Sequence, residues 1–316
     1  MNAARRVIAL SGGVGGAKLA AGLAAELAPE ELLIVANTGD DFEHLGLPIC
    51  PDLDTLMYTL AGVADPLQGW GRADESWHCL QALGSLGAPD WFRLGDRDLA
   101  THLARGAWLR EGLTLSEATA RACAALGVRH AIVPMSDAPV RTRVLSERGE
   151  LAFQEYFVRE RCAPVVSALR YAGAESAAIA PLVAEWLAAE RAPAVVICPS
   201  NPFLSVDPIL ALPRMRARLI RACTVAVSPI VGGRALKGPA AALMAQLGLE
   251  VSALAVARHY GALLRGFVLD ELDASQADAV RALGLEVLVT DTVMTDATSK
   301  RRLAREVLEF VDGLAA

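Results

Sequence analysis

Lysine is scarce in this sequence, and an excess of positive charge is absent. Only three of the 30 basic residues are lysines, at positions 18, 237 and 300, and 36 acidic residues leave a net charge of −6. Proteins that bind nucleic acid usually carry a basic face, so the composition excludes bulk attraction to nucleic acid. Two of the three lysines, Lys18 and Lys237, lie in glycine-flanked segments, which marks both as candidates for anion contact.

Long hydrophobic runs and paired cysteines are also absent. Charge-free stretches such as 238–249 are shorter than the ~20 apolar residues of a membrane span. Only four apolar residues, 7–10, precede the first glycines, which is too few for the core of a signal peptide. The six cysteines are dispersed, without a Cys-x-x-Cys pair or a zinc-binding spacing. We therefore expect a cytoplasmic protein with reduced thiols and no membrane partner.

Short apolar runs alternate with alanine- and leucine-rich segments along most of the chain, whose residues are 53% hydrophobic. The predicted strands are 7–10, 32–36, 130–134, 194–198, 223–228, 266–269 and 286–289. The predicted helices are 18–27, 75–86, 98–109, 116–126, 179–190, 239–247, 275–283 and 298–312. This alternation predicts a doubly wound, mostly parallel, Rossmann-like α/β sheet. Ligands of such sheets bind beyond the carboxyl ends of the strands.

Two stretches interrupt the alternation. Residues 66–128 are mostly helical in pattern, and 141–158 resemble a hairpin with strands at 141–146 and 151–157. Repeats, low-complexity runs and long linkers are missing, so we predict one α/β domain over 1–316. A mainly helical cap or insertion is expected at approximately 66–190.

The first predicted strand runs directly into the glycine-rich segment Ser-Gly-Gly-Val-Gly-Gly-Ala-Lys at 11–18. Glycines let the backbone approach a ligand closely, and the free N–H groups of a following helix form a phosphate site. The segment lacks the Gly-Lys-Ser/Thr ending of a Walker A loop, and Lys18 replaces the third small residue of the dinucleotide fingerprint. The alternative is a glycine-rich turn that only lets helix and strand pack closely. The candidate phosphate-binding residues are Gly12, Gly13, Gly15 and Lys18.

Acidic residues are concentrated after the second predicted strand. The segments Asn-Thr-Gly-Asp-Asp at 37–41 and Pro-Asp-Leu-Asp-Thr at 51–55 place four carboxylates within fifteen residues. Carboxylates next to a phosphate site repel the ligand unless a divalent cation lies between them, and Mg²⁺ prefers oxygen ligands. We predict a Mg²⁺ site formed by some of Asp40, Asp52 and Asp54. In the alternative, Asp54 caps a helix that starts at Thr55, and the aspartates at 40 and 41 are turn residues.

Polar residues also follow later predicted strands. Ser200 and Asn201 lie between two prolines after the strand at 194–198, where their donors and acceptors suit a ligand or a turn. Arg234 and Lys237 bring two cations into a second glycine-rich loop, and we favour contact with an anion.

The segment 90–98 combines aromatic and charged residues before a predicted helix. Arg93 can contact phosphate or hydroxyl groups. Trp91 and Phe92 can stack on a flat ring, although such a pair is more often part of a core. A serine nucleophile is not indicated, because Gly-x-Ser-x-Gly is absent. The five histidines form no recognisable triad, and we interpret each as structural or exposed.

Eight segments together make the chain resemble the 2-phospho-L-lactate transferase family of coenzyme F-420 biosynthesis. They are SGGVGGAKL, NTGDD, PDLDTLMY, WFRLGDRDLA, MSDAPVRT, FQEYFVRER, PSNPFLSVDPIL and VSPIVGGRALKGPA, in the family's order from residue 8 to about 240. The resemblance implies a Mg²⁺-dependent phosphotransferase and suggests a homodimer. It implies a guanylyl diphospho donor that carries a three-carbon acid, and the deazaflavin alcohol Fo as acceptor. The terminal ribityl hydroxyl of Fo attacks the distal phosphorus, and GMP leaves.

The resemblance also implies roles for particular residues. Asp54 and Arg93 match the positions that hold the deazaflavin alcohol, and Asp54 and Asp52 are the candidate catalytic residues. Ser200 and Asn201 match positions along the nucleotide. The three-carbon acid stays open between phospholactyl, phosphoenolpyruvyl and phosphoglyceryl groups, which differ by only a few atoms.

Two rival interpretations remain from the sequence. One is a non-catalytic sugar-nucleotide-binding regulatory protein of the same superfamily, which would share the glycine-rich and acidic segments. The other is a dinucleotide-dependent oxidoreductase, which the displaced glycine spacing disfavours.

Overall fold

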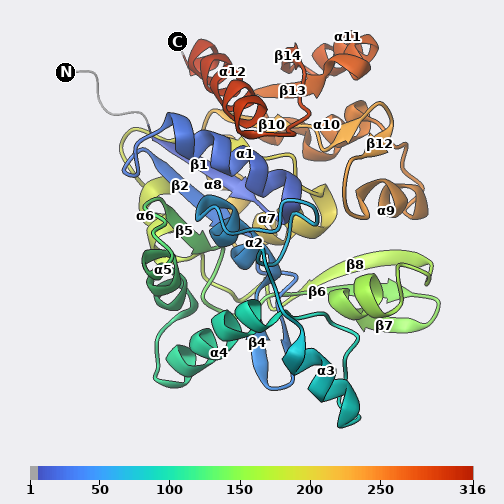
Figure 1. The fold of residues 1–316 in the computed structure, drawn as a ribbon. Coiled ribbons are helices and arrows are strands. Elements are labelled where there is room, and N and C mark those ends of the chain that lie inside the picture. The colour runs from blue at the N-terminus through green and yellow to red at the C-terminus, as the bar shows by residue number, and fades with distance from the viewer. Residues whose placement is uncertain (1–5, 316) are drawn as a thin grey trace.

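A central sheet of seven parallel strands organises the protein (Figure 1), whose computed structural model describes residues 6–315. The strand order is β14-β13-β10-β9-β1-β2-β5. The strands are β1 (Val7–Ser11), β2 (Leu32–Ala36), β5 (Ala131–Pro134), β9 (Ala194–Ile197), β10 (Thr224–Val227), β13 (Gly266–Asp270) and β14 (Glu286–Thr290). Each coincides with one of the seven predicted strands, and the predicted doubly wound α/β class is confirmed.

The order in which the chain adds strands to the sheet reverses direction at β1. The space beyond the carboxyl end of this strand is therefore the expected ligand site. β1 pairs with β2 on one side and with β9 on the other, and Leu10 lies opposite Ile197. From β1 the chain builds the sheet outward first through β2 and β5, and then through β9 to β14. The crevice of a doubly wound sheet opens at such a switch point, beyond the carboxyl ends of the strands. The glycine-rich segment after β1 and the loop after β9 therefore meet at this crevice.

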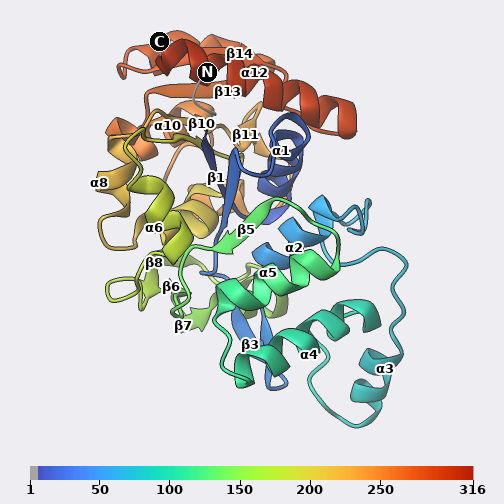
Figure 2. The same cartoon turned by 90° about the vertical axis from the view of Figure 1, so that its left-hand side faces the viewer.

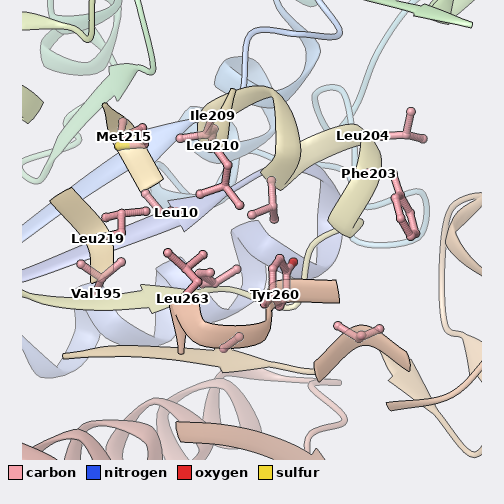
Figure 3. Close-up of a cluster of buried hydrophobic side chains, with 14 of the residues drawn as sticks. Leu10, Val195, Phe203, Leu204, Ile209, Leu210, Met215, Leu219, Tyr260 and Leu263 are labelled. Carbon is pink, nitrogen blue, oxygen red and sulfur yellow. The ribbon is translucent and has the colours of Figure 1, made fainter. Parts of the chain in front are cut away.

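Helices cover both faces of the sheet because alternate side chains of each strand point to opposite faces. Val7 and Ala9 face one core, to which α1, α2 and α12 contribute buried side chains. Ile8 and Leu10 face the other core, which includes residues of α6, α7, α8 and α10. Figure 3 shows part of this second core, where Leu10 and Val195 of the sheet lie near Leu219, and Tyr260 belongs to the same cluster beyond Leu263.

The helices differ from the sequence predictions mainly in number. The α-helices are α1 (Gly13–Glu26), α2 (Pro51–Leu60), α3 (His78–Ser85), α4 (Asp96–Arg110), α5 (Leu115–Ala125), α6 (Pro181–Leu187), α7 (Asp207–Leu210), α8 (Met215–Ile220), α9 (Ala240–Gln246), α10 (Ala253–Tyr260), α11 (Ala277–Arg281) and α12 (Ala297–Ala315). Short π and 3₁₀ segments are η1 (Glu155–Arg159), η2 (Pro202–Val206), η3 (Gly261–Leu263) and η4 (Glu271–Gln276). Helices α7, α8 and α10 were not predicted, and α2 was expected only in the alternative in which Asp54 caps a helix that starts at Thr55. Among residues 6–315, none of the helices combines the length and apolar character that a membrane span requires.

Two groups of elements lie outside the central sheet. Helices α3 and α4 lie at the end of the molecule opposite α12, as the two views agree (Figures 1 and 2). A three-stranded antiparallel sheet has the order β7-β6-β8, and the two-stranded ribbons are β3–β4 and β11–β12. Their bounds are β3 (Phe42–His44), β4 (Leu47–Ile49), β6 (Arg141–Ser146), β7 (Gly149–Ala152), β8 (Val166–Ala172), β11 (Ile230–Val231) and β12 (Arg234–Ala235).

The range 66–190, expected as a cap, includes β5 of the central sheet, so it is not one continuous insertion. Helices α3 and α4 precede β5 in the chain, and the β7-β6-β8 sheet follows it. The predicted hairpin is present as β6 and β7, but its second strand ends at Ala152 because the chain then enters η1. The third strand, β8, was not predicted. It pairs with β6 through contacts distant in sequence, such as Thr142 opposite Tyr171.

Two helix starts correct the sequence predictions. Helix α1 begins at Gly13 rather than at Lys18, so the glycines form its first turn. A Cβ at Gly15 would lie 2.4 Å from the Pro199 carbonyl oxygen, which shows that close packing requires this glycine. Helix α2 begins at Pro51, with Cys50 as its N-cap, and not at Thr55. The alternative in which Asp54 caps this helix is therefore excluded, because proline starts the helix one turn earlier.

Candidate active site

A cavity of about 930 Å³ lies beyond the carboxyl ends of the central strands. Eleven of the twelve site residues predicted from the sequence line it: Gly12, Gly13, Gly15, Lys18, Asp40, Asp52, Asp54, Arg93, Ser200, Asn201 and Lys237. The twelfth, Arg234, is exposed on β12 and does not line the cavity. The structure thus brings together residues that lie far apart in the sequence, at the place where a doubly wound sheet binds its ligands.

The glycine-rich segment and the acidic helix α2 contact each other directly. The Gly13 N–H donates to Asp52 Oδ1 over 2.7 Å, and Asn37 Nδ2 donates to Asp52 Oδ2 over 2.9 Å. A Cβ at Gly12 would lie 2.5 Å from Asp52 Oδ2, so only glycine allows this approach. The amides of the α1 N-terminus and the carboxylates of α2 therefore face one shared space.

Asp40 and Asp52 form a pair of buried carboxylates without a cationic side chain bonded to either among residues 6–315. Burial, followed by the charge of Asp52, raises the pKa of Asp40 well above its ordinary value. Burial also raises the pKa of Asp52, although hydrogen bonds from Asn37 and Gly13 oppose this. Asp40 Oδ1 has no hydrogen-bond partner in the part of the chain that the structure describes. Two such carboxylates suit a hard divalent cation, which prefers oxygen ligands.

Asp54 has a different environment, because Arg105 of α4 pairs with both of its oxygens. Arg105 Nη1 donates to Asp54 Oδ2 over 3.1 Å, and Nη2 contacts Oδ1. Both side chains are buried, and the pair is bidentate. The charge of Asp54 is thus already balanced by the protein itself.

A hydrogen-bonded group surrounds this ion pair. The Tyr58 hydroxyl donates to Asp98 Oδ1 over 2.7 Å, and His102 lies 3.4 Å from Asp98 Oδ1 and 3.7 Å from Asp54 Oδ2. Asp54, Asp98 and His102 are close enough to share a metal ion, but the guanidinium of Arg105 already occupies the Asp54 oxygens.

Sequence reasoning missed this group, and His102 was assigned no role in the site. Asp98, His102 and Arg105 are spaced i, i+4 and i+7, which places them on one face of a helix. This spacing is the signal that could have identified the group.

The loop after β9 holds the glycine-rich segment from its other side. Ser200 Oγ donates to the Gly12 carbonyl over 2.8 Å and accepts from the Gly12 N–H over 3.1 Å. Asn201 Oδ1 accepts from the backbone N–H groups of residues 203 and 204 at the start of η2. Asn201 Nδ2 is buried and has no hydrogen-bond partner within residues 6–315. This amide can donate to a ligand in the cavity.

Two lysines reach across the cavity to backbone carbonyls. Lys18 Nζ donates to the Met294 carbonyl over 2.7 Å, and Lys237 Nζ donates to the Gln68 carbonyl over 2.9 Å. Burial lowers the pKa of Lys18, and the charges of Lys237 and Lys300 lower it further. The charges of the other two lysines therefore act on Lys18, which lines the cavity.

Aromatic side chains line another part of the cavity. Trp91 and Phe92 belong to this lining, and the Phe92 ring meets that of Phe42 edge-on at 4.8 Å between centroids. The Arg93 guanidinium lies 4.4 Å from the centroid of the Trp77 ring. A flat, apolar ligand with polar edges would fit such a wall.

Comparisons with known proteins agree with the resemblance seen in the sequence. Residues 7–309 match the family model described as 2-phospho-L-lactate transferase CofD. A phosphoenolpyruvate transferase of Streptomyces avermitilis is 42% identical over 317 residues, which cover 97% of this chain and 98% of that protein. A 2-phospho-L-lactate transferase of Methanosarcina acetivorans is 40% identical over 308 residues, covering 98% of both chains.

A solved structure supports the fold. A protein of the UPF0052 family from Bacillus halodurans aligns with a TM-score of 0.61 at 14% identity, covering 98% of this chain and 100% of that one. At this identity the likeness concerns the fold alone. The match over residues 7–309 and the relatives at 40% identity or more decide the family. The chain belongs to the 2-phospho-L-lactate transferase CofD family.

Proposed function

We propose that this protein transfers a phospho-three-carbon-acid group from a guanylyl diphospho donor to the terminal ribityl hydroxyl of the deazaflavin alcohol Fo. GMP is released, and the product belongs to coenzyme F-420 biosynthesis. The family and the names of the relatives support a transferase of this kind and do not favour a non-catalytic regulatory protein. The observation that carries the proposal is the direct contact of the Gly13 amide with Asp52 in a cavity at the switch point of the sheet.

The donor's diphosphate fits the N-terminus of α1. This helix begins at Gly13, and its dipole favours negative charge at this end, where the Gly13 N–H is bonded to Asp52. Lys18 and Lys237 line the same cavity, and Asn201 Nδ2 offers a further unpaired donor. These groups together provide positive charge and hydrogen-bond donors for two phosphates and the nucleoside attached to them.

Asp40 and Asp52 are the residues that would hold Mg²⁺. They fit the ion because both are buried without a bonded cationic side chain, and Asp40 Oδ1 lacks a partner within residues 6–315. When bound there, Mg²⁺ would neutralise charge on the diphosphate oxygens, as in other phosphoryl transfers. The diphosphate would then be bound by the α1 amides on one side and by the carboxylate-held Mg²⁺ on the other.

The acceptor fits the aromatic side of the cavity. Trp91 and Phe92 would pack against the deazaflavin ring, and Arg93 would bind its polar groups. Asp54 would accept a hydrogen bond from the terminal hydroxyl and orient it toward the distal phosphorus. As the new O–P bond forms, the bond from that phosphorus to the bridging oxygen breaks and GMP keeps this oxygen. The hydroxyl proton, which Asp54 hydrogen-bonds, is lost to water. Positioning and charge neutralisation supply most of the catalysis in such a step.

The test is to mix the purified protein with Fo, Mg²⁺ and each of the three guanylyl donors in turn. Mass spectrometry of the products identifies the acid that is transferred, and the release of GMP is measured in parallel. Asp52→Asn and a reaction with a metal chelator serve as controls and should give no product. Absence of product with every donor, from a folded wild-type protein with Mg²⁺ present, would refute the proposed function.

The homodimer expected from the resemblance stays a prediction. Light scattering coupled to size-exclusion chromatography would give the mass in solution, to be compared with 33.3 kDa for one chain.

A further inference from the structure

Asp52 and Asp54 lie two residues apart in the first turn of α2, but the structure gives them opposite surroundings. Each is 5% exposed. Asp52 accepts hydrogen bonds from the uncharged donors Gly13 N–H and Asn37 Nδ2. Asp54 instead shares both of its oxygens with the guanidinium of Arg105. Two carboxylates that look equivalent in the sequence are therefore chemically different.

Arg105 is itself fixed by several contacts. Its side chain is buried, and Nη1 also approaches the Pro48 carbonyl at 3.4 Å and His102 Nδ1 at 3.3 Å. A guanidinium stays protonated in proteins, so its charge faces Asp54 permanently. Arg105 cannot move to another partner without leaving a buried charge unpaired, which is strongly unfavourable.

The pair determines what Asp54 can bind. A carboxylate offers about four acceptor positions, and Arg105 uses one on each oxygen, while Asp54 still lines the cavity. A divalent cation on these oxygens would lie beside the guanidinium in a buried place, where repulsion between positive charges is strong. A hydroxyl donor meets no such repulsion. The remaining acceptor positions of Asp54 therefore suit a hydroxyl and disfavour a metal ion.

Helix α4 connects this pair to the rest of the acceptor side. Arg93 lies just before α4, and Arg105 lies within it. Tyr58 of α2 bonds to Asp98 of α4 over 2.7 Å, which provides a second tie between the two helices. The orientation of Asp54 is thus set by the same helix that follows the aromatic segment.

We propose that Arg105 is a positioning residue that excludes Asp54 from metal binding and reserves it for the hydroxyl of the acceptor. The inference rests on the proposed function and adds to it a division of labour between the carboxylates of α2. Asp52 binds the metal ion on the donor side, whereas Asp54, held by Arg105, binds the hydroxyl of the acceptor.

The experiment compares Arg105→Lys with Arg110→Lys, an exposed arginine of the same helix. Lysine keeps the charge but loses the bidentate geometry. Steady-state kinetics are measured with the acceptor and the donor varied separately. For Arg105→Lys we expect the KM for Fo to rise at least tenfold and kcat to fall, while the KM for the donor stays within twofold. Arg110→Lys should match the wild type. A merely structural role would lower the melting temperature and leave the KM for Fo unchanged.

A second measurement does not depend on activity. Mn²⁺, a paramagnetic substitute for Mg²⁺, is titrated with GDP present and followed by electron paramagnetic resonance. The double variant Asp54→Asn/Arg105→Gln replaces the ion pair by two amides, which avoids an unpaired buried charge. We expect it to bind Mn²⁺ within twofold of the wild type, and Asp52→Asn to bind at least tenfold more weakly.

The outcomes separate this inference from the proposed function. Tenfold weaker Mn²⁺ binding by the double variant would show that Asp54 is a metal ligand and would overturn the inference. An unchanged KM for Fo and kcat in folded Arg105→Lys would do the same. Absence of product from the wild type would refute the proposed function and this inference with it. Product from the wild type combined with normal Arg105→Lys kinetics would refute only the role of Arg105.

Discussion

Replacing Gly12 by alanine tests whether the glycine-rich segment and Asp52 act as one unit. Gly12 has an extended backbone with φ of −158°, which any residue adopts, so alanine causes no backbone strain there. The added Cβ would instead lie 2.5 Å from Asp52 Oδ2 and 2.6 Å from the Ser205 Cβ. One of these groups has to move by several tenths of an ångström or more. We expect Asp52 to be displaced from the Gly13 amide and from Asn37.

The loss of stability and the loss of activity expected for Gly12→Ala have separate causes. Overpacking a buried position costs about 1–3 kcal/mol of unfolding free energy. For a chain of 316 residues the entropy of unfolding is about 0.66 kcal/mol per degree, so the melting temperature should fall by roughly 2–5 °C. Misplacing a catalytic group by about 1 Å costs on the order of 100-fold in rate. We therefore expect kcat/KM to fall about 100-fold in a protein that is still folded.

Gly22→Ala is the matched control, because it puts the same methyl group on the same helix away from the cavity. Its Cβ would lie 2.2 Å from the Lys300 carbonyl oxygen, where α1 packs against α12. A similar loss of melting temperature is expected, with kcat/KM within a few-fold of the wild type. Thermal unfolding and product formation are measured for both variants. Wild-type activity and Mn²⁺ affinity in Gly12→Ala would refute the reasoning.

Three further predictions concern single side chains. Asp52→Asn should abolish turnover and weaken Mn²⁺ binding at least tenfold, and wild-type rates at limiting Mg²⁺ would contradict the assignment of the metal site. Arg93→Ala should raise the KM for Fo more than that for the donor, and a change confined to the donor would show that Arg93 does not bind the acceptor. Burial raises the pKa of Asp41 to about 7, so without metal its buried charge lowers stability as the pH rises from about 4 to 7. Asp41→Asn should therefore stabilise the chelator-treated protein at pH 8 by up to about 4 kcal/mol but not at pH 4, and equal melting-temperature differences at both pH values would contradict this.

Much of the central architecture could be predicted from local sequence patterns. Strands buried on both faces are continuous apolar runs, and all seven were found at or within one residue of their predicted starts. Their alternation with helical segments is enough to predict a doubly wound sheet. The position of the ligand site follows as well, because such sheets bind ligands where the strand order reverses. The clustering of the glycine-rich and acidic segments was predictable for this reason.

Elements that depend on distant partners were harder to predict. The strand β8 has an unremarkable local pattern and exists because it pairs with β6. The start of α1 was placed five residues late because glycines usually indicate a loop. Position 15 of the helix requires glycine because the Pro199 carbonyl fills the space that a side chain would need. Neither contact leaves a signal in the residues next to it.

The sequence alone determined the sheet, the place of the cavity and the kind of chemistry that lines it. Burial, periodicity and glycine content are local properties, so a reader of the sequence can evaluate them without coordinates. Only the tertiary structure decided that Asp52 and Asp54 differ, since Arg105 lies 51 residues away from the carboxylate that it neutralises. Which charges are paired depends on distances in space, and these distances arise only when α2 and α4 pack together.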